Sequence, residues 1–501
     1  MTDSEPAGGE QQARVIATSG DDLAVTSHTL TTAAGNEIRY TASAGRVVLR
    51  EQVLGEDGVF KGVEPKADMF VVAYTADGAD PATRPVTFAF NGGPGSSSVW
   101  LHLGLLGPRR VLMGDAGALD PPPYGIGDNA ESLLAHSDLV FIDPVTTGYS
   151  RVVAGGKPSE YHGFQRDLES VGELIRLWTS RNQRWLSPKY LAGESYGTMR
   201  ASALAAYLQR EFGLFCNGII LISSVIDMTT TRFTDGNDLP SVMFLPTYAA
   251  IAHYHGLHGG RALRDVIDEA VALAAGPYPR GLAAGSRLPA AERADLIRQV
   301  ASVTGLSEGY VRRVNMRIEH RRFYRELLRD RGQVTGRLDG RFLGWEADDG
   351  GELPAHDPSY AAIHGPYSAA VNHYVRAELG YESDLPFEIL TGRVQPWSYA
   401  EFEGRHVSVS SMLGEAMRHN RHLRVYVGCG YYDGATPFYG AEYAFAHLDI
   451  PGELRSNISF AYYEAGHMMY VHEPTRLRQS AALAAFVGGP PPFVGSPPPS
   501  A

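Results

Sequence analysis

KYLAGESYGTMRASALAAYLQREF, residues 189–212, is the stretch that decides the fold class of this chain. Residues 189–193 form a short, largely apolar run typical of a buried strand, and the apolar positions of 201–212 recur at the spacing of one helix face. Between these segments, GESYG at 193–197 fits the pattern G-x-S-x-G, in which a serine occupies a sharp turn from a strand to a helix. The stretch predicts that Ser195 stands at the edge of a sheet with its hydroxyl exposed.

Other segments of strand length flank this turn along the chain. They are VTFAF at 86–90, DLVFID at 138–143, NGIILISS at 217–224, LRVYVG at 423–428 and SNISFAYYEAGH at 456–467. Strands that are apolar almost throughout and alternate with helices are typical of a parallel sheet covered on both faces. We therefore expect an α/β fold with a mostly parallel central sheet and helices on both faces. NEIRYTASAGRVVLRE at 36–51 is interpreted as a hairpin of two short strands.

The spacing of these strands predicts an inserted domain. Roughly 200 residues separate the strand at 217–224 from the one at 423–428, whereas a crossover between parallel strands needs only about a dozen. The intervening residues contain helical stretches, so we expect a helical cap. The expected domains are a mobile tail at 1–30, the core at 31–226 and 406–488, the cap at 227–405 and a proline-rich mobile tail at 489–501.

The composition is that of a soluble globular protein, with 44% hydrophobic and 20% charged residues. Its 44 Lys and Arg against 56 Asp and Glu give a net charge of −12, which disfavours binding to nucleic acid. No signal peptide and no apolar stretch of membrane-spanning length are visible, so we expect a cytoplasmic protein without a membrane partner. Cys216 and Cys429, the two cysteines, favour a reducing compartment, although a bridge between them is compatible with the sequence.

The predicted elements separate Ser195 from a second match to the same pattern. Ser307, in GLSEG, precedes a helical pattern without a strand before it and is interpreted as a helix N-cap. A serine hydroxyl becomes a nucleophile when an imidazole takes its proton and a carboxylate orients that imidazole. Asp433 and His467 each follow a predicted strand, in the chain order serine, acid, histidine. Two further acids also follow strands and are interpreted as structural or substrate-facing, namely Asp143 and Asp227.

A glycine-rich loop, NGGPGSSS at 91–98, follows the strand at 86–90. Acyl transfer needs N–H donors aimed at the developing oxyanion. Tyr196, directly after the candidate nucleophile, offers one such N–H, and this loop offers the other because residues without a side chain let the backbone approach closely. The other interpretation of the loop is a hairpin or a phosphate nest, but it lacks the lysine of a P-loop and the spacing of a dinucleotide fingerprint.

Together, four separated motifs resemble the serine carboxypeptidase family of α/β-hydrolases. They are FAFNGGPGSSS at 88–98, GESYG at 193–197, the aspartate of GYYDGATP at 430–437 and the histidine of EAGHMM at 464–469. The resemblance implies an α/β-hydrolase fold, with Ser195, Asp433 and His467 as the triad and the N–H groups of Gly93 and Tyr196 as the oxyanion hole. It also implies that the free carboxylate of a peptide is bound by Asn91, Gly92 and Glu194.

Several positions depart from the family pattern. The family's second glutamate, shortly before a Gly-Pro, is Leu105 here, so the carboxyl pair beside the substrate carboxylate is incomplete and the pH optimum is open. Arg109 or Arg110 is a candidate to attract that carboxylate instead. Ser96 stands where eukaryotic members have a disulfide cysteine, and Phe90 ends the preceding strand. With the missing signal, these departures suggest a bacterial, intracellular variant.

The reaction implied by the resemblance is hydrolysis of C-terminal residues from peptides through an acyl-enzyme on Ser195, with no cofactor and no metal. The partner is then a peptide with a free C-terminus, while the oligomeric state, the side-chain preference and the physiological substrate stay open. An esterase or an acyltransferase would use the same triad, and a catalytically inactive binding protein would share the fold.

Two further groups of residues are weighed as sites. His253, His255 and His258 lie in a helical pattern without a cysteine or clustered acid to complete a four-ligand set, so no metal site is expected there. Cys429 precedes Asp433 by four residues, but no strand-to-helix turn surrounds it. It is interpreted as a small buried thiol.

Overall fold

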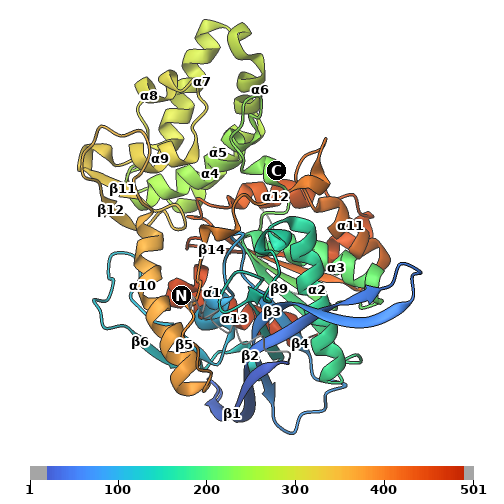
Figure 1. Cartoon of the computed structure of the whole chain (residues 1–501). Helices are drawn as coiled ribbons and strands as arrows, with labels where there is room; N and C mark the ends of the chain where they lie inside the picture. Colours follow the sequence, from blue (N-terminus) through green and yellow to red (C-terminus); the bar gives the residue numbers. More distant parts are fainter. Residues whose placement is uncertain (1–19, 490–501) are drawn as a thin grey trace, which may run out of the picture.

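A large mixed sheet runs through the centre of the computed structural model, which describes residues 20–489 (Figure 1). Its strand order is β1-β2-β3-β7-β4-β9-β10-β13-β14, with β8 beside β3. Neighbouring strands are parallel from β7 to β14 and antiparallel from β1 to β7. The strands are β1 (Asp22–Thr31), β2 (Glu37–Leu54), β3 (Phe60–Ala76), β4 (Val86–Phe90), β7 (Asp138–Ile142), β8 (Arg151–Val152), β9 (Lys189–Glu194), β10 (Gly218–Ile222), β13 (Arg424–Gly430) and β14 (Ile458–Tyr463).

Helices pack on both faces of this sheet. Successive strand residues point to opposite faces, so Leu191 enters one apolar core and the next residue, Ala192, enters the other. The first core is covered by α2 (Phe164–Arg181), α3 (Tyr196–Phe212), α11 (Ser410–His419) and α12 (Phe438–Ala446), and the second by α1 (Val99–Leu101), α10 (Pro358–His373) and α13 (Glu473–Gly488). The predicted mostly parallel sheet with helices on both faces is confirmed.

Between β10 and β13 the chain builds the cap drawn at the top of Figure 1. Its elements are α4 (Leu239–Tyr254), α5 (Leu263–Ala275), α6 (Pro277–Ala284), α7 (Ala290–Thr304), α8 (Glu308–Arg313), α9 (His320–Glu326) and the small sheet of β11 (Gln333–Thr335) and β12 (Leu343–Trp345). α10 then runs back beside the hairpin of β5 (Arg109–Leu112) and β6 (Gly125–Asp128). The cap expected at 227–405 therefore includes a segment, from α10 onward, that lies against the core.

The sequence-based expectations for the N-terminal part need two corrections. Residues 22–31, most of which fall in the expected mobile tail, form β1 at the edge of the sheet, while 1–19 and 490–501 lie outside the described residues. The hairpin expected at 36–51 is one long strand, β2. Gly45 does not turn the chain there, because it pairs with both neighbouring strands and a Cβ on it would lie 2.0 Å from the Asp22 carbonyl oxygen.

None of the helices in the described part of the chain combines the length and the hydropathy that a bilayer crossing requires. The cysteine bridge left open by the sequence is absent within residues 20–489, since Cys216 and Cys429 are both free and buried. Burial raises the pKa of the Cys429 thiol well above its usual value, which fits its interpretation as an inert buried group.

The close approach of β1 at Gly45 is open to a stability test. Gly45→Ala would force β1 away from β2, and we expect the free energy of unfolding to fall by about 1–3 kcal/mol. Gly260→Ala is the matched control, because nothing lies within 4 Å of a Cβ at Gly260. Chemical denaturation of both variants checks this, and equal stability of the two would contradict the role given to Gly45.

Candidate active site

Ser195 occupies the turn between β9 and α3, in a backbone conformation that side chains rarely adopt. Its φ is 60° and its ψ is −129°, and its side chain is partly exposed. The flanking glycines are sterically required, since a Cβ on Gly193 would lie 2.1 Å from the Gly197 carbonyl oxygen and one on Gly197 would lie 2.9 Å from that of Phe90. The local sequence therefore holds the Ser195 hydroxyl at the carboxyl edge of the sheet.

His467 and Asp433 meet beside this turn. His467 Nδ1 lies 2.8 Å from Asp433 Oδ2, and both side chains are buried. Thr436, which the sequence reasoning missed, donates its hydroxyl to Asp433 Oδ2 at 2.6 Å and its backbone N–H to Oδ1 at 2.9 Å. Burial lowers the pKa of His467, but the Asp433 carboxylate outweighs this effect, so that the pKa lies above its ordinary value of 6.5.

The serine and the histidine line a common chamber of about 180 Å³, which also holds Glu194 and Asn91. No hydrogen bond joins the Ser195 hydroxyl to His467 among the described residues. A second chamber of about 450 Å³ is also lined by Ser195, but Asp433 and His467 do not line it. Ser195 therefore borders both a chamber that His467 lines and a chamber that it does not.

The glycine-rich loop after β4 presses against the start of α3. A Cβ on Gly92 would lie 2.4 Å from the Tyr196 nitrogen, so no larger residue fits there. Gly93, Ser195 and Tyr196 line the same chamber. Asp143 anchors the far end of the loop by accepting hydrogen bonds from the Ser98 N–H and hydroxyl, both at 2.7 Å. The two candidate oxyanion donors and the candidate nucleophile thus face one space, and Asp143 has a structural role.

Glu194, next to the candidate nucleophile, is a buried carboxyl group that accepts hydrogen bonds from two side chains. Asn91 Nδ2 donates to its Oε1 at 2.9 Å and the Tyr470 hydroxyl donates to its Oε2 at 2.7 Å. Burial raises the pKa of Glu194 to about 7, although His467 and these two donors oppose the rise. Glu194 therefore changes between its neutral and its charged form near neutral pH.

Tyr470 was not found from the sequence, and it occupies the region of the missing second glutamate. Leu105 lies in the short helix η1 (His102–Leu106) and is buried. The Tyr470 ring packs against the same helix, because a Cβ on Gly104 would lie 2.3 Å from it. A phenol hydroxyl is therefore the neighbour of Glu194 on this side. The sequence signal that could have identified Tyr470 as a site residue is its position three residues after His467.

Both arginines suggested as surrogates for the missing glutamate are paired elsewhere, so that suggestion is wrong. Arg109 forms salt bridges with Asp128 and Glu378, and Arg110 forms one with Glu473. The three cap histidines donate to backbone carbonyl oxygens, and no group of metal-ligating side chains is found within residues 20–489. The remaining two candidates are helix caps, Asp227 accepting from Thr229 N and Ser307 accepting from Tyr310 N.

Residues 58–225, from β3 past the serine turn, match the family model described as serine carboxypeptidase. A search of curated proteins gives no significant match. Among solved structures, the proline iminopeptidase of Mycobacterium smegmatis is 13% identical with a TM-score of 0.36, covering 88% of this chain and 97% of its own. An α/β-hydrolase fold protein of Chitinophaga pinensis is 9% identical with a TM-score of 0.34, covering 88% and 97%. At such TM-scores these neighbours carry no argument about function.

The strand order, the helices on both faces and the serine at the end of β9 define an α/β-hydrolase. Within that class, residues 58–225 are similar to the serine carboxypeptidase family, in agreement with the resemblance of the two motifs that lie in this part of the chain.

The raised pKa of Glu194 has a consequence for stability. Because the folded state holds its proton to about pH 7 and the unfolded state only to about 4.5, the stability of the folded protein is lost as the pH rises through this window. Glu194→Gln cannot lose a proton and therefore lacks this pH-dependent loss. We expect the free energy of unfolding of the variant minus that of the unmodified protein to increase between pH 4.5 and 7, by at most about 3 kcal/mol. Urea denaturation across pH checks this, and a pH-independent difference would contradict it.

Proposed function

We propose that this protein is a serine carboxypeptidase that removes single residues from the C-termini of peptides. The observation that carries the proposal is Glu194, a buried carboxyl group beside the candidate nucleophile whose proton is held to about pH 7. A neutral carboxyl group can donate a hydrogen bond to a carboxylate, whereas a charged one would repel it. A free peptide C-terminus is the group that such a donor fits.

In the proposed reaction, the Ser195 hydroxyl attacks the last peptide carbonyl while His467 accepts its proton. The N–H groups of Gly93 and Tyr196 bind the oxyanion of the tetrahedral intermediate. His467 then gives the proton to the leaving amine, and water hydrolyses the acyl-enzyme with His467 again as the base. Asp433, held by Thr436, orients the imidazole and stabilises its charged form.

The position of His467 orders the substrate in the two chambers. Since His467 protonates the leaving amine, the C-terminal residue belongs in the chamber that His467 lines, and the acyl part of the peptide belongs in the other. The first chamber also holds Asn91, Gly92 and Glu194. These three residues are the proposed receptor of the substrate carboxylate, with Tyr470 positioning Glu194.

An esterase or an acyltransferase is the second candidate, and Leu105 favours it. Because an apolar residue stands in place of the second glutamate, the proton of Glu194 is the one carboxyl proton available for a hydrogen bond to the substrate carboxylate. A protein that does not read a terminal carboxylate would use the same triad on an ester.

Removal of the nucleophile tests the reaction. We expect Ser195→Ala to lower kcat on a blocked dipeptide by at least about 1,000-fold and to abolish labelling by a fluorophosphonate, because the acyl-enzyme cannot form. Ser307→Ala, in the second G-x-S-x-G match, is the control and should keep both. Turnover by Ser195→Ala at the rate of the unmodified protein would overturn the triad, and labelling without peptidase activity would favour the second candidate.

The pH dependence tests the carboxylate receptor. Above pH 7, Glu194 becomes charged and repels the substrate carboxylate, so we expect KM for a blocked dipeptide acid to rise about tenfold per pH unit. The corresponding dipeptide amide lacks the carboxylate and should show no such rise. In Glu194→Gln the amide stays neutral, and the rise for the acid should disappear. The same pH dependence of KM for the acid and the amide would show that Glu194 does not bind the terminal carboxylate.

A further inference from the structure

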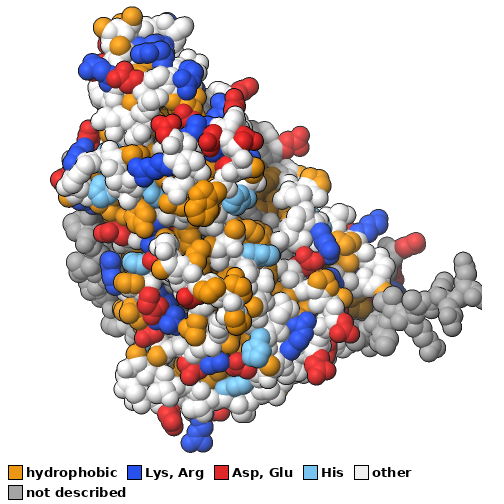
Figure 2. Space-filling view, turned by 90° about the vertical axis from the view of Figure 1, so that its left-hand side faces the viewer, with side chains coloured by type: hydrophobic (Ala, Val, Ile, Leu, Met, Phe, Trp, Pro, Cys, Tyr) orange, Lys and Arg blue, Asp and Glu red, His pale blue; other side chains and the backbone are white. Residues whose placement is uncertain are grey.

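The chamber assigned to the acyl part of the substrate contains two arginines. Arg232 and Arg337 line it, and no aspartate or glutamate is among its lining residues. This is unusual for a chain with a net charge of −12. Charged side chains of both signs are interspersed over the outer surface of the cap (Figure 2), so the excess of positive charge in the chamber is local.

Arg337 lies in the cap, in the loop between β11 and β12, and reaches both chambers around Ser195. The loop is tied to the triad, because the neighbouring Leu338 carbonyl accepts a hydrogen bond of 2.6 Å from the His467 N–H. The positive charge of Arg337 acts on His467, since it opposes protonation of the imidazole. Arg337 is therefore fixed within electrostatic range of the reacting groups.

Arg232, the second arginine of this chamber, lies just after the short helix η4 (Met228–Thr230). Its guanidinium lies 4.9 Å from the centre of the Tyr399 ring. Contact with an aromatic ring restricts a guanidinium, and with five N–H donors the group can still bind an anion. Tyr399 itself belongs to the chamber wall with Trp397, so Arg232 is held toward the space that the substrate would fill.

Neither arginine forms a salt bridge with another described residue. Other arginines near the core differ in this respect, since Arg200 is paired with Asp167 and Arg341 with Asp339. Two side chains that line a cavity, carry the same charge and have no carboxylate partner form a receptor for an anion.

We propose that Arg232 and Arg337 select an acidic side chain at the penultimate position of the peptide, the residue whose carbonyl Ser195 attacks. The proposal rests on the proposed function, because the assignment of the two chambers follows from the role of His467. A glutamate or aspartate side chain entering this chamber would face both guanidinium groups. The preferred substrates are then peptides that end in an acidic residue followed by one further residue.

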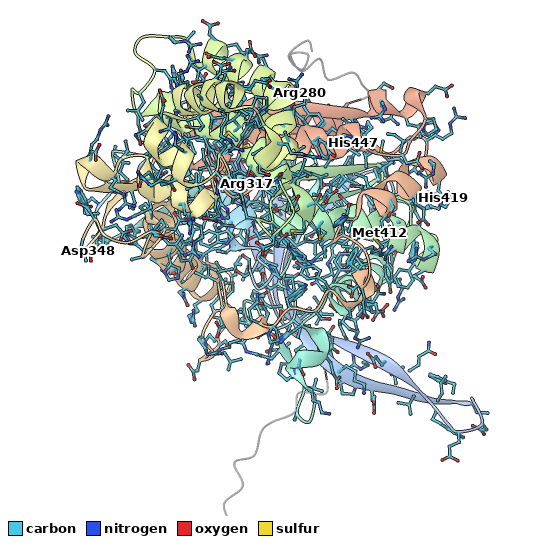
Figure 3. All side chains as sticks on the ribbon, turned by 90° about the horizontal axis from the view of Figure 1, so that it is seen from above. Arg280, Arg317, Asp348, Met412, His419 and His447 are labelled. Carbon is cyan, nitrogen blue, oxygen red and sulfur yellow. The ribbon has the colours of Figure 1, made fainter. Side chains whose placement is uncertain are left out.

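A pair of substrates of equal shape tests the preference. Blocked Glu-Phe and blocked Gln-Phe differ in one charge, and we expect kcat/KM to be about tenfold higher for the glutamate substrate at low salt. The double variant Arg232→Gln/Arg337→Gln should bring the ratio of the two kcat/KM values to about one. The ratio is the readout, because loss of the Arg337 charge also acts on His467 and so changes turnover of both substrates equally. Arg280→Gln, on the outside of the cap in α6 (Figure 3), is the control for net charge and should keep the preference.

Two results would overturn the proposal. Equal kcat/KM for the two substrates would show that the chamber does not read the charge. A double variant that loses activity equally on both substrates, and so keeps the preference, would show that the arginines act on what both substrates share, the terminal carboxylate or the reaction at His467.

A binding measurement separates failure of this proposal from failure of the proposed function. N-acetyl-glutamate α-amide and N-acetyl-glutamine α-amide compete with fluorophosphonate labelling of Ser195 without any peptide bond being cleaved. We expect the glutamate compound to protect Ser195 at about tenfold lower concentration, and the double variant to remove the difference. This result without peptidase activity would overturn the carboxypeptidase function and keep the anion receptor. Equal protection by both compounds would overturn the receptor.

Discussion

Contact between three backbone segments at the Ser195 turn is the constraint on which the candidate site depends. The loop after β4, the end of β9 and the start of α3 approach so closely that Gly92, Gly193 and Gly197 cannot carry a side chain. Arg200 reinforces this contact, since it donates to the Asn91 carbonyl oxygen at 2.6 Å and is buried in a salt bridge with Asp167 of α2. The positions of the candidate nucleophile, of both candidate oxyanion donors and of Glu194 all follow from this one packing arrangement.

Much of this arrangement could be predicted from the sequence because its signals are local. A strand followed by G-x-S-x-G defines the turn at Ser195, and Asp433 and His467 are recognised by their places after strands. Thr436 and Tyr470 also lie within three residues of these positions, yet their contacts depend on how the side chains fold back. Arg337 gave no local signal, because it is far from His467 in the sequence and the cap brings its loop to His467 through the Leu338 carbonyl.

The incorrect predictions have a common physical origin in partners that are distant in the sequence. The segment 36–51 was expected to turn back as a hairpin, but it is one strand in which β1 requires a glycine at position 45 for its close approach. Arg109 looks like a free cation after the glycine-rich loop, whereas acids from β6 and from residue 378 neutralise it. In both cases the residue type was interpreted correctly and the role was decided by a segment that local patterns do not reveal.

Two carboxyl groups near Ser195 differ in their surroundings, and this difference accounts for the chemistry proposed. Asp433 accepts hydrogen bonds from Ala435 N, Thr436 N and the Thr436 hydroxyl, in addition to its contact with His467. Glu194 is equally buried but accepts two hydrogen bonds from neutral side chains. Two like charges about 4 Å apart repel by about 4 kcal/mol near a protein surface, so a substrate carboxylate requires Glu194 to be neutral. Arg232 and Arg337 then make the other chamber positive, and a substrate with a second negative charge beyond the cleaved bond would complement both sides of the serine.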